Sequence, residues 1–395
     1  MRSETKFPFQ LNQKAQDAVA SLAADCIACG ACTRHCRFLE KYGLDLREFA
    51  QRPELYYSCF LCGRCDEVCP RQISGRAIAV SGRSALLADD ADNAKEVKRT
   101  YRFLLWEKDP YRFAAYQKSK TVSVLWTGCN FTGFFPKTEE RLRKLFAAHG
   151  IGVIYDCCGK PVSELGFSGD AERNLAKIGR KLLENGVREL IMVCPNCYYY
   201  MRDKLPEGIS CVTVYRKLRE LGIGNVLRNV SVGNTYIRNS LGKSGAVSAD
   251  DGQFSDCQPN VERGGQLSDN RSNADADSRF PLYLPCPDRA ERVFYQDLLP
   301  FLPEYAETKT YREIPCCGLG GCAAVREAEL ARGMAAQAKD MGGGLPLFTY
   351  CASCVSQFRR NGFCGAQHVL PLILGVEENL PGGIRPFLNR AAKKL

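Results

Sequence analysis

The sequence predicts an all-α, cysteine-rich domain followed by two repeated α/β domains with parallel-sheet character. Three observations predict this order. Two runs of four cysteines near the N-terminus lie among segments whose apolar residues recur at helical spacing. From about residue 119, short apolar segments typical of strands alternate with amphipathic segments typical of helices, as in parallel sheets. The cysteine pattern of this second part then occurs twice.

Composition narrows the class of protein. The chain has 395 residues, of which 45% are hydrophobic and 25% charged, which is typical of a globular protein with two or three domains. The formal charge of +10 comes from scattered Lys and Arg, so we expect no nucleic-acid partner. No apolar stretch is long enough for a membrane span, and the N-terminus lacks the apolar core of a signal peptide. We therefore expect a cytoplasmic protein, either free or held at the inner face of the membrane by a partner subunit.

The 22 cysteines carry most of the functional information. In a reducing compartment, metal ligation is favoured over disulfides. Two N-terminal runs read C-x2-C-x2-C-x3-C, the bacterial ferredoxin spacing for a [4Fe-4S] cluster. Three closely spaced thiolates can bind one cube, and the fourth is better placed for the neighbouring cube. The predicted ligands are Cys26, Cys29, Cys32 and Cys69 for one cluster, and Cys59, Cys62, Cys65 and Cys36 for the other.

Segments 42–58 and 92–117 have helical patterns and lie next to these runs. We therefore predict an all-α di-cluster ferredoxin-like domain over residues 1–118. A pair of zinc sites is the alternative, but zinc sites typically use two C-x2-C knuckles rather than four evenly spaced thiols.

The second part contains two units in which strand-like segments end at cysteines. In the first unit, residues 119–225, helical segments at 137–150 and 169–186 separate the strands, and Gly186 is a helix C-cap. In the second unit, residues 281–395, strands are expected at 279–285, 307–315 and 345–350, with a helix at 322–344. The cysteines that follow the strands are Cys129, Cys157, Cys158, Cys194 and Cys197 in the first unit, and Cys286, Cys316, Cys317, Cys351 and Cys354 in the second.

The intervals between these cysteines agree, which indicates an internal duplication. Cys129 and Cys157 are 28 positions apart, and Cys286 and Cys316 are 30 apart. Parallel strands place their carboxyl ends at one edge of a sheet, where ligands bind. Each unit should therefore gather five thiols in one crevice.

Adjacent cysteines suggest an open cluster. Neighbouring side chains on an extended chain point to opposite sides, so Cys157 and Cys158 can bind different irons of such a cluster. Gly159 and Gly318 would let the backbone approach inorganic sulfur. Two alternatives remain: a vicinal disulfide or redox switch, and a zinc site that uses the "CPNC" or "CASC" knuckle.

The two motifs, C-x27-CCG-x34-C-x2-C and C-x29-CCG-x32-C-x2-C, resemble the cysteine-rich CCG domain of the heterodisulfide reductase family. With the preceding domain, the chain is similar to the family's D-type subunit and to the iron–sulfur subunits of glycolate oxidase and anaerobic glycerol-3-phosphate dehydrogenase. The resemblance implies a non-cubane [4Fe-4S] cluster on each CCG motif. Five cysteines in both repeats favour the reductase branch. The sequence "PCPDR" departs from the family, where Cys-His is expected.

Two classes of function follow. In the first, electrons pass from two cubanes to paired CCG clusters that split a small disulfide. In the second, the chain relays electrons from a flavin-dependent 2-hydroxyacid or glycerol-3-phosphate dehydrogenase toward quinone. No G-x-G-x-x-G follows a strand, so we expect no flavin or nucleotide site in this chain. The electron partner should be another subunit: a flavoprotein, a ferredoxin-linked protein or a membrane cytochrome-b-like protein.

The remaining expectations concern single residues and one segment. Residues 226–280 are predicted as a flexible linker or insertion, with Cys257 as an incidental thiol. Lys160 and His368 are candidate proton donors because they lie close to the repeats in sequence. Trp126 and Cys211 are expected in the core, and Cys322 near the second CCG site.

Overall fold

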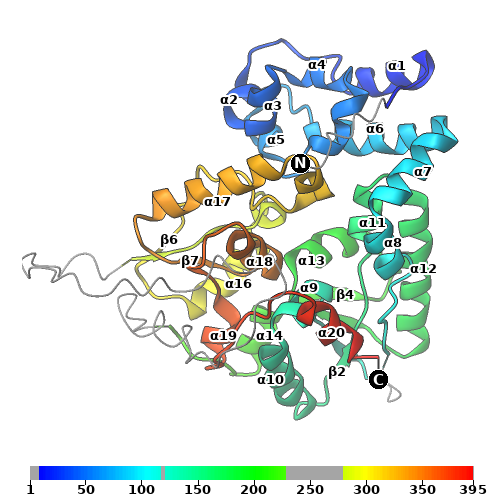
Figure 1. The fold of residues 1–395 in the computed structure, drawn as a ribbon. Coiled ribbons are helices and arrows are strands. Elements are labelled where there is room, and N and C mark those ends of the chain that lie inside the picture. Colours follow the sequence, from blue (N-terminus) through cyan, green and yellow to red (C-terminus); the bar gives the residue numbers. More distant parts are fainter. Residues whose placement is uncertain (1–8, 117–120, 228–278, 395) are drawn as a thin grey trace, which may run out of the picture.

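The computed structural model describes residues 9–116, 121–227 and 279–394, so the predicted linker and Cys257 lie outside the described residues except at the linker's ends. Helices dominate the N-terminal region, whose first part lies at one end of the molecule in blue and whose last part, in cyan, lies beside the first repeat (Figure 1). They are α1 (Gln13–Ser21), α2 (Ala31–His35), α3 (Arg37–Tyr42), α4 (Leu46–Ala50), the 3-10 helix η1 (Pro53–Ser58), α5 (Arg64–Val68), α6 (Gly75–Asp89), α7 (Ala91–Thr100) and α8 (Arg102–Lys108). This confirms the predicted all-α region.

Local capping explains two of these helices. Asp45 and Glu48 form a capping box at α4, and the Ser74 hydroxyl accepts a hydrogen bond from the Ala77 N–H at α6. Helix α8 ends at Lys108, so the expected helix does not continue to residue 117. Instead, Ala115 pairs with Tyr155 as an isolated bridge, which attaches this segment to the first repeat.

The first repeat contains a four-stranded parallel sheet with the order β2-β1-β3-β4. Apolar, β-branched residues build these short strands, and helices cross between them as expected for parallel pairing. The elements are β1 (Ser123–Trp126), α9 (Cys129–Phe134), α10 (Pro136–Ala147), β2 (Gly152–Ile154), α11 (Lys160–Glu164), α12 (Ser168–Glu184), β3 (Glu189–Met192), α13 (Pro195–Met201), β4 (Ser210–Thr213) and α14 (Val214–Glu220). Trp126 is fully buried, as predicted.

The second repeat follows the same plan with shorter strands. Strand β5 pairs with β6, β7 pairs with β8, and a bridge between Leu282 and Phe348 connects the two parallel pairs. The resulting order, β6-β5-β7-β8, matches β2-β1-β3-β4. The elements are β5 (Phe280–Pro281), η3 (Cys286–Asp288), α16 (Val293–Leu298), η4 (Leu299–Phe301), β6 (Ala306–Glu307), η5 (Gly320–Val325), α17 (Ala328–Gly342), β7 (Leu347–Thr349), α18 (Ala352–Arg360), β8 (Ala366–His368), α19 (Val369–Ile373) and α20 (Arg385–Ala391).

One expectation for this repeat was wrong. The strand expected at 307–315 is limited to Ala306–Glu307, because the Glu307 carboxylate accepts hydrogen bonds from the backbone of Lys309 and Thr310 and turns the chain. Phe280 lies where the predicted linker overlaps the strand expected at 279–285; it is buried in β5 and stacks on Phe348 with ring centroids 3.9 Å apart. The apolar character of these residues outweighs the polar segment before them.

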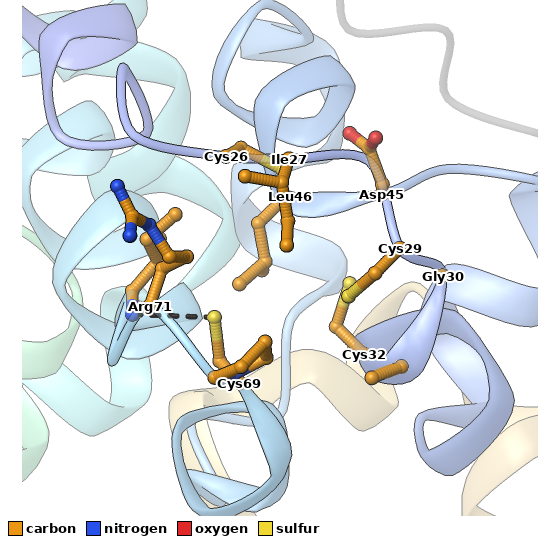
Figure 2. A pocket seen from close by; sticks show the side chains of 12 residues that line it. Cys26, Ile27, Cys29, Gly30, Cys32, Asp45, Leu46, Cys69 and Arg71 are labelled. Carbon is orange, nitrogen blue, oxygen red and sulfur yellow. Dashed lines mark hydrogen bonds between the residues drawn. The ribbon is translucent and has the colours of Figure 1, made fainter.

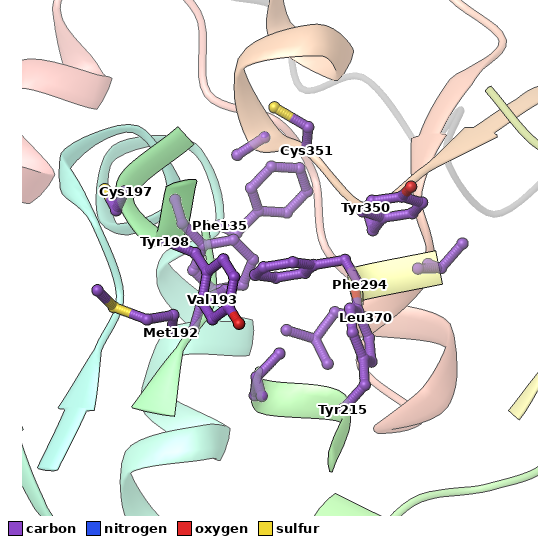
Figure 3. Close-up of a cluster of buried hydrophobic side chains, with 14 of the residues drawn as sticks. Phe135, Met192, Val193, Cys197, Tyr198, Tyr215, Phe294, Tyr350, Cys351 and Leu370 are labelled. Carbon is purple, nitrogen blue, oxygen red and sulfur yellow. The ribbon is translucent and has the colours of Figure 1, made fainter. Parts of the chain in front are cut away.

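The two repeats share one hydrophobic core (Figure 3). Tyr198 of α13 packs edge-on against Phe294 of α16, with ring centroids 5.5 Å apart. Phe294 in turn stacks on Tyr350, which immediately precedes Cys351. Aromatic side chains therefore fill the space between the two repeats and fix their relative position.

Helix α20 returns from the second repeat to cover α9 of the first. The buried Arg390 guanidinium donates to both carboxylate oxygens of Glu107, at 2.7 and 3.0 Å. Asn389 donates to the Gly133 carbonyl at 2.9 Å. The C-terminal segment thus joins α8 to the first repeat.

Candidate metal centres

The first group of predicted ligands borders a hollow in the helical region (Figure 2). Cys26, Cys29 and Cys32 of the first run and Cys69 of the second run all line it. Cys69 lies just after α5, and the Ile73 N–H lies 3.4 Å from its sulfur. The exchange of the fourth cysteine between the two runs is the arrangement expected for ferredoxin-type cluster pairs.

The second ferredoxin-type group lines another hollow. Its thiols are Cys36, Cys59, Cys62 and Cys65. Arg76 of α6 also borders this hollow, and so do Pro315 and Met334 of the second repeat. The wall of the second centre is therefore built partly by a distant segment of the chain.

Each repeat gathers its five cysteines beyond the ends of its strands. In the first, hydrogen-bonding contacts run from Cys129 to Cys157, to Cys158, to Cys197 and to Cys194. In the second, the same contacts run along Cys316, Cys317, Cys354 and Cys351, and Cys286 lies close to the adjacent pair. The two groups share the order of the last four thiols, but Cys157 contacts the first cysteine of its own repeat, whereas Cys316 contacts Cys62 of the helical region.

A tight turn fixes each adjacent pair. Gly159 and Gly318 both have left-handed backbone conformations, with φ of 82° and 85°. A Cβ atom at Gly318 would lie 3.0 Å from Ala331 of α17, and Gly159 faces the corresponding Ala171 of α12 at 3.6 Å. The backbone conformation and the close helix thus explain why glycine follows each pair.

Hydrogen bonding distinguishes the second cysteine of each pair. Contacts from Cys157 and Cys197 lower the pKa of Cys158, and contacts from Cys316 and Cys354 lower the pKa of Cys317. Burial instead raises the pKa of Cys36 and Cys59 to about 12. Buried thiols such as Cys36 and Cys59 lose their proton readily only when a metal takes its place. These cysteines therefore suit metal ligation.

Buried cations surround the thiols. Lys108 lies near Cys129 and Cys157, and its ammonium pairs with Glu107 at 2.7 Å. Lys160, Arg76 and Arg289 lie near Cys286. Thiolate-bound iron–sulfur clusters carry net negative charge, which such cations would offset in a buried site.

The four groups of thiols form a continuous series. Cys32 and Cys36 connect the two hollows, and the Cys62 thiol lies within hydrogen-bonding reach of Cys316. Between the repeats, the Asn196 amide lies 3.7 Å from the Cys351 sulfur, and Asn130 donates to Ser353 at 2.7 Å. In this series the five-thiol group of the second repeat lies between the ferredoxin-type groups and the five-thiol group of the first repeat, although it comes last in the sequence.

A close backbone contact holds the second repeat against the helical region. A Cβ atom at Gly320 would lie only 2.1 Å from the Phe60 carbonyl oxygen, so only glycine fits there. Arg83 of α6 donates to the carbonyls of Cys59, Glu164 and Gly321, at 2.9, 2.6 and 3.0 Å. It thereby joins the helical region to both repeats.

The donor arrangement does not match a single metal ion. Within residues 9–116, 121–227 and 279–394, no three His, Cys, Asp or Glu side chains form a group that could hold one ion. Mononuclear zinc needs four ligands converging at about 2.0–2.3 Å. The eight ferredoxin-type thiols border hollows, which suits a larger, multinuclear group, and all eighteen predicted ligands are free thiols.

The other candidate residues have different surroundings. Burial lowers the pKa of His368 to about 3, and its Nδ1 accepts a hydrogen bond from the Leu370 N–H at 3.1 Å. His368 is thus a neutral helix cap rather than a proton donor near neutral pH. Lys160 pairs with Glu164 and lies near Cys286, and Cys322 packs beside the helical core. The cysteine pattern did not point to the cations Arg76, Lys108 and Arg289; only Arg289 had a signal in the sequence, because it lies in the unusual "PCPDR" segment.

Comparison with known proteins agrees with this architecture. Residues 123–202 and 284–359 each match the family of cysteine-rich CCG domains. One subunit of the fumarate reductase (CoM/CoB) of Methanothermobacter marburgensis is 24% identical over 213 residues, which cover 46% of this chain and 43% of that protein. An uncharacterized iron–sulfur protein of Methanococcus maripaludis is 23% identical over 246 residues, covering 52% of this chain and 47% of that one.

The chain thus spans less than half the length of these two relatives. No solved structure is significantly similar to it. In the part of the chain that the structure describes, no helix combines the length and apolar character needed to cross a membrane. The chain therefore carries two cysteine-rich domains of the CCG type and is distantly related to an iron–sulfur protein and to a subunit of an oxidoreductase.

Proposed function

We propose that the chain is the iron–sulfur subunit of an oxidoreductase that reduces a small disulfide, as in the heterodisulfide reductase family. The observation that carries this proposal is the unbroken series of four cysteine groups, which ends in two five-thiol groups that face each other through Asn196 and Cys351. A protein that only relays electrons would need the series of cysteine groups and no substrate site. In the proposed reaction, a disulfide receives two electrons and two protons to give two thiols, and the two neighbouring five-thiol groups would each hold one half of it.

The ligands proposed for the ferredoxin-type clusters are the eight N-terminal thiols, and the ten CCG thiols are proposed to hold the other two clusters. When bound, the clusters would supply one-electron transfer along the series and a site for two-electron cleavage of the disulfide. The chain's own residues bind and position: the Cys-Cys-Gly turns hold the two thiols of each adjacent pair within hydrogen-bonding reach of each other, and Lys108 and Lys160 provide positive charge beside them. The electron donor would be a partner subunit; the lack of a G-x-G-x-x-G after a strand in this sequence supports that proposal.

The test uses the full-length, cluster-loaded protein and follows oxidation of reduced methyl viologen by small disulfides with anionic groups. Cys158→Ser and Cys317→Ser should each remove most of the activity, and the double variant should lose little more, since residues that act as a unit are non-additive. Cys211→Ser, outside both groups, is the matched control and should keep full activity. If either single variant stays fully active, paired action is wrong. If no disulfide is reduced but electrons pass from a reduced flavoprotein to a quinone analogue, the relay function replaces this one.

A further inference from the structure

Arg289 lies where the second ferredoxin-type group meets the second CCG group. Its Nη2 donates to the carbonyl of Cys62 at 2.7 Å, and its Nη1 donates to the carbonyl of Pro315 at 2.9 Å. Pro315 immediately precedes Cys316, whose thiol lies within reach of the Cys62 thiol. One guanidinium therefore holds the two cysteine-bearing loops together from the side of their backbones.

The surroundings of Arg289 make its charge effective. The side chain is only 11% exposed, and the thiols of Cys62 and Cys286 both lie near the guanidinium. Its Nε lies 3.2 Å from Glu67 but is not aligned for a hydrogen bond, so this buried N–H has no acceptor among the described residues. Glu67 itself is 32% exposed, and water weakens its compensation of the cation.

Charge at this position affects electron transfer. Reduction adds negative charge to a cluster, so a nearby fixed cation favours the reduced form, and hydrogen bonds to cluster sulfur act in the same direction. Arginine keeps its charge at any working pH. The sequence "PCPDR", unusual for the family, thus places a permanent cation three residues after Cys286.

We propose that Arg289 is a positioning residue for electron transfer between the second ferredoxin-type group and the second CCG group. It keeps the Cys62 and Cys316 loops in contact, and its charge favours the electron at this junction. In this step one electron would pass from the second ferredoxin-type group to the second CCG group, with no bond made or broken. The inference rests on the proposed clusters, but it applies equally to a disulfide reductase and to a relay.

The experiment compares Arg289→Gln, Arg289→Lys and the control Arg312→Gln, which removes the same charge from an exposed position in the same repeat. Iron content and EPR-monitored redox titrations are measured on the loaded, full-length protein. Arg289→Gln should lower the midpoint potentials of the two clusters at the junction and leave the first ferredoxin-type cluster and the first CCG cluster unchanged. It should also slow reduction of the second CCG cluster by about tenfold, equivalent to about 1.4 kcal/mol on the barrier.

Arg289→Lys separates charge from geometry. It should keep the potentials near those of the wild type while still slowing electron transfer, because lysine cannot bind both carbonyls in a fixed fork. Arg312→Gln should change neither quantity. Unchanged potentials in Arg289→Gln, or an equal shift of all four clusters, would overturn the proposal. If Arg289→Gln fails to bind iron, Arg289→Lys still tests the proposal. A wild-type rate of reduction of the second CCG cluster in Arg289→Lys would also overturn the proposal. A wild type that reduces no disulfide, with these shifts intact, would contradict only the proposed function.

Discussion

At the residue scale, burial determines which side chains can take part in acid–base chemistry. His368 packs against the rings of Phe131 and Phe135, with centroids 5.3 and 5.0 Å away, and is 3% exposed. Burial therefore opposes protonation and lowers the pKa to about 3, against about 6.5 for an unfolded chain. Between these two values the unfolded chain binds a proton that the folded protein does not.

This difference predicts a pH-dependent loss of stability. As the pH falls below about 6.5, the folded protein should lose about 1.4 kcal/mol per pH unit through His368. His368→Asn keeps a capping side chain for α19 but removes the titration. Urea unfolding at pH 7.5 and 5.5 should show a smaller pH effect in the variant by about 1 kcal/mol. Any loss of clusters in acid would affect the wild type and the His368→Asn variant alike. An equal fall in the free energy of unfolding in both proteins would therefore show that His368 does not cause the pH dependence.

At the element scale, helix α6 connects three parts of the molecule through one side chain. Arg83 is fully buried and stacks on Tyr57, with its guanidinium carbon 4.8 Å from the ring centroid. Its remaining contacts are backbone carbonyls of the helical region and of both repeats. A sequence pattern shows only an arginine in a helix, whereas the structure shows the junction.

Replacing Arg83 by lysine should lower the free energy of unfolding by about 2–4 kcal/mol. Lysine keeps the charge but cannot satisfy four separated carbonyls, and each buried group left unpaired costs about 1–3 kcal/mol. Arg99→Lys, on the exposed face of α7, is the control and should change the stability by less than about 0.5 kcal/mol. Chemical denaturation measures both, and a loss below about 1 kcal/mol in Arg83→Lys would contradict the assigned role.

At the scale of the whole molecule, four cysteine groups predict four clusters. We expect about sixteen irons per chain by anaerobic metal analysis, since each group would hold a four-iron cluster. About eight irons would leave only the ferredoxin-type clusters. Zinc at one or more per chain would instead favour the knuckle alternative for a CCG group.

The order of the groups predicts a second result. Cys62→Ser should abolish turnover with a protein donor, because Cys62 belongs to the second ferredoxin-type group and lies within hydrogen-bonding reach of Cys316. Activity driven by a small reductant that reaches the CCG groups directly should remain. Equal loss in both assays, with circular dichroism unchanged, would show that electrons do not follow this order.

How well a feature could be predicted from the sequence depends on how far apart in the chain its contacting residues are. The cysteine spacing suffices to anticipate which thiols lie together, because each set comes from a short run or from parallel strand ends that meet at one edge. Contacts between distant segments decide the rest. Sequence periodicity does not show that Gly320 presses against Phe60, or that Glu307 turns the chain after β6. Nor does it show that the second repeat, rather than the first, contacts the ferredoxin-type groups.

The return of α20 to the first repeat has a consequence for biosynthesis. Glu107, next to Lys108 near Cys129 and Cys157, obtains its Arg390 partner only after residue 390 has left the ribosome. The helical region can fold early, as N-terminal domains generally do. The first CCG group, although it precedes the second in translation order, reaches its final surroundings only after α20 has been made. A chain that stops before α20 would leave Glu107 without its Arg390 partner beside this group.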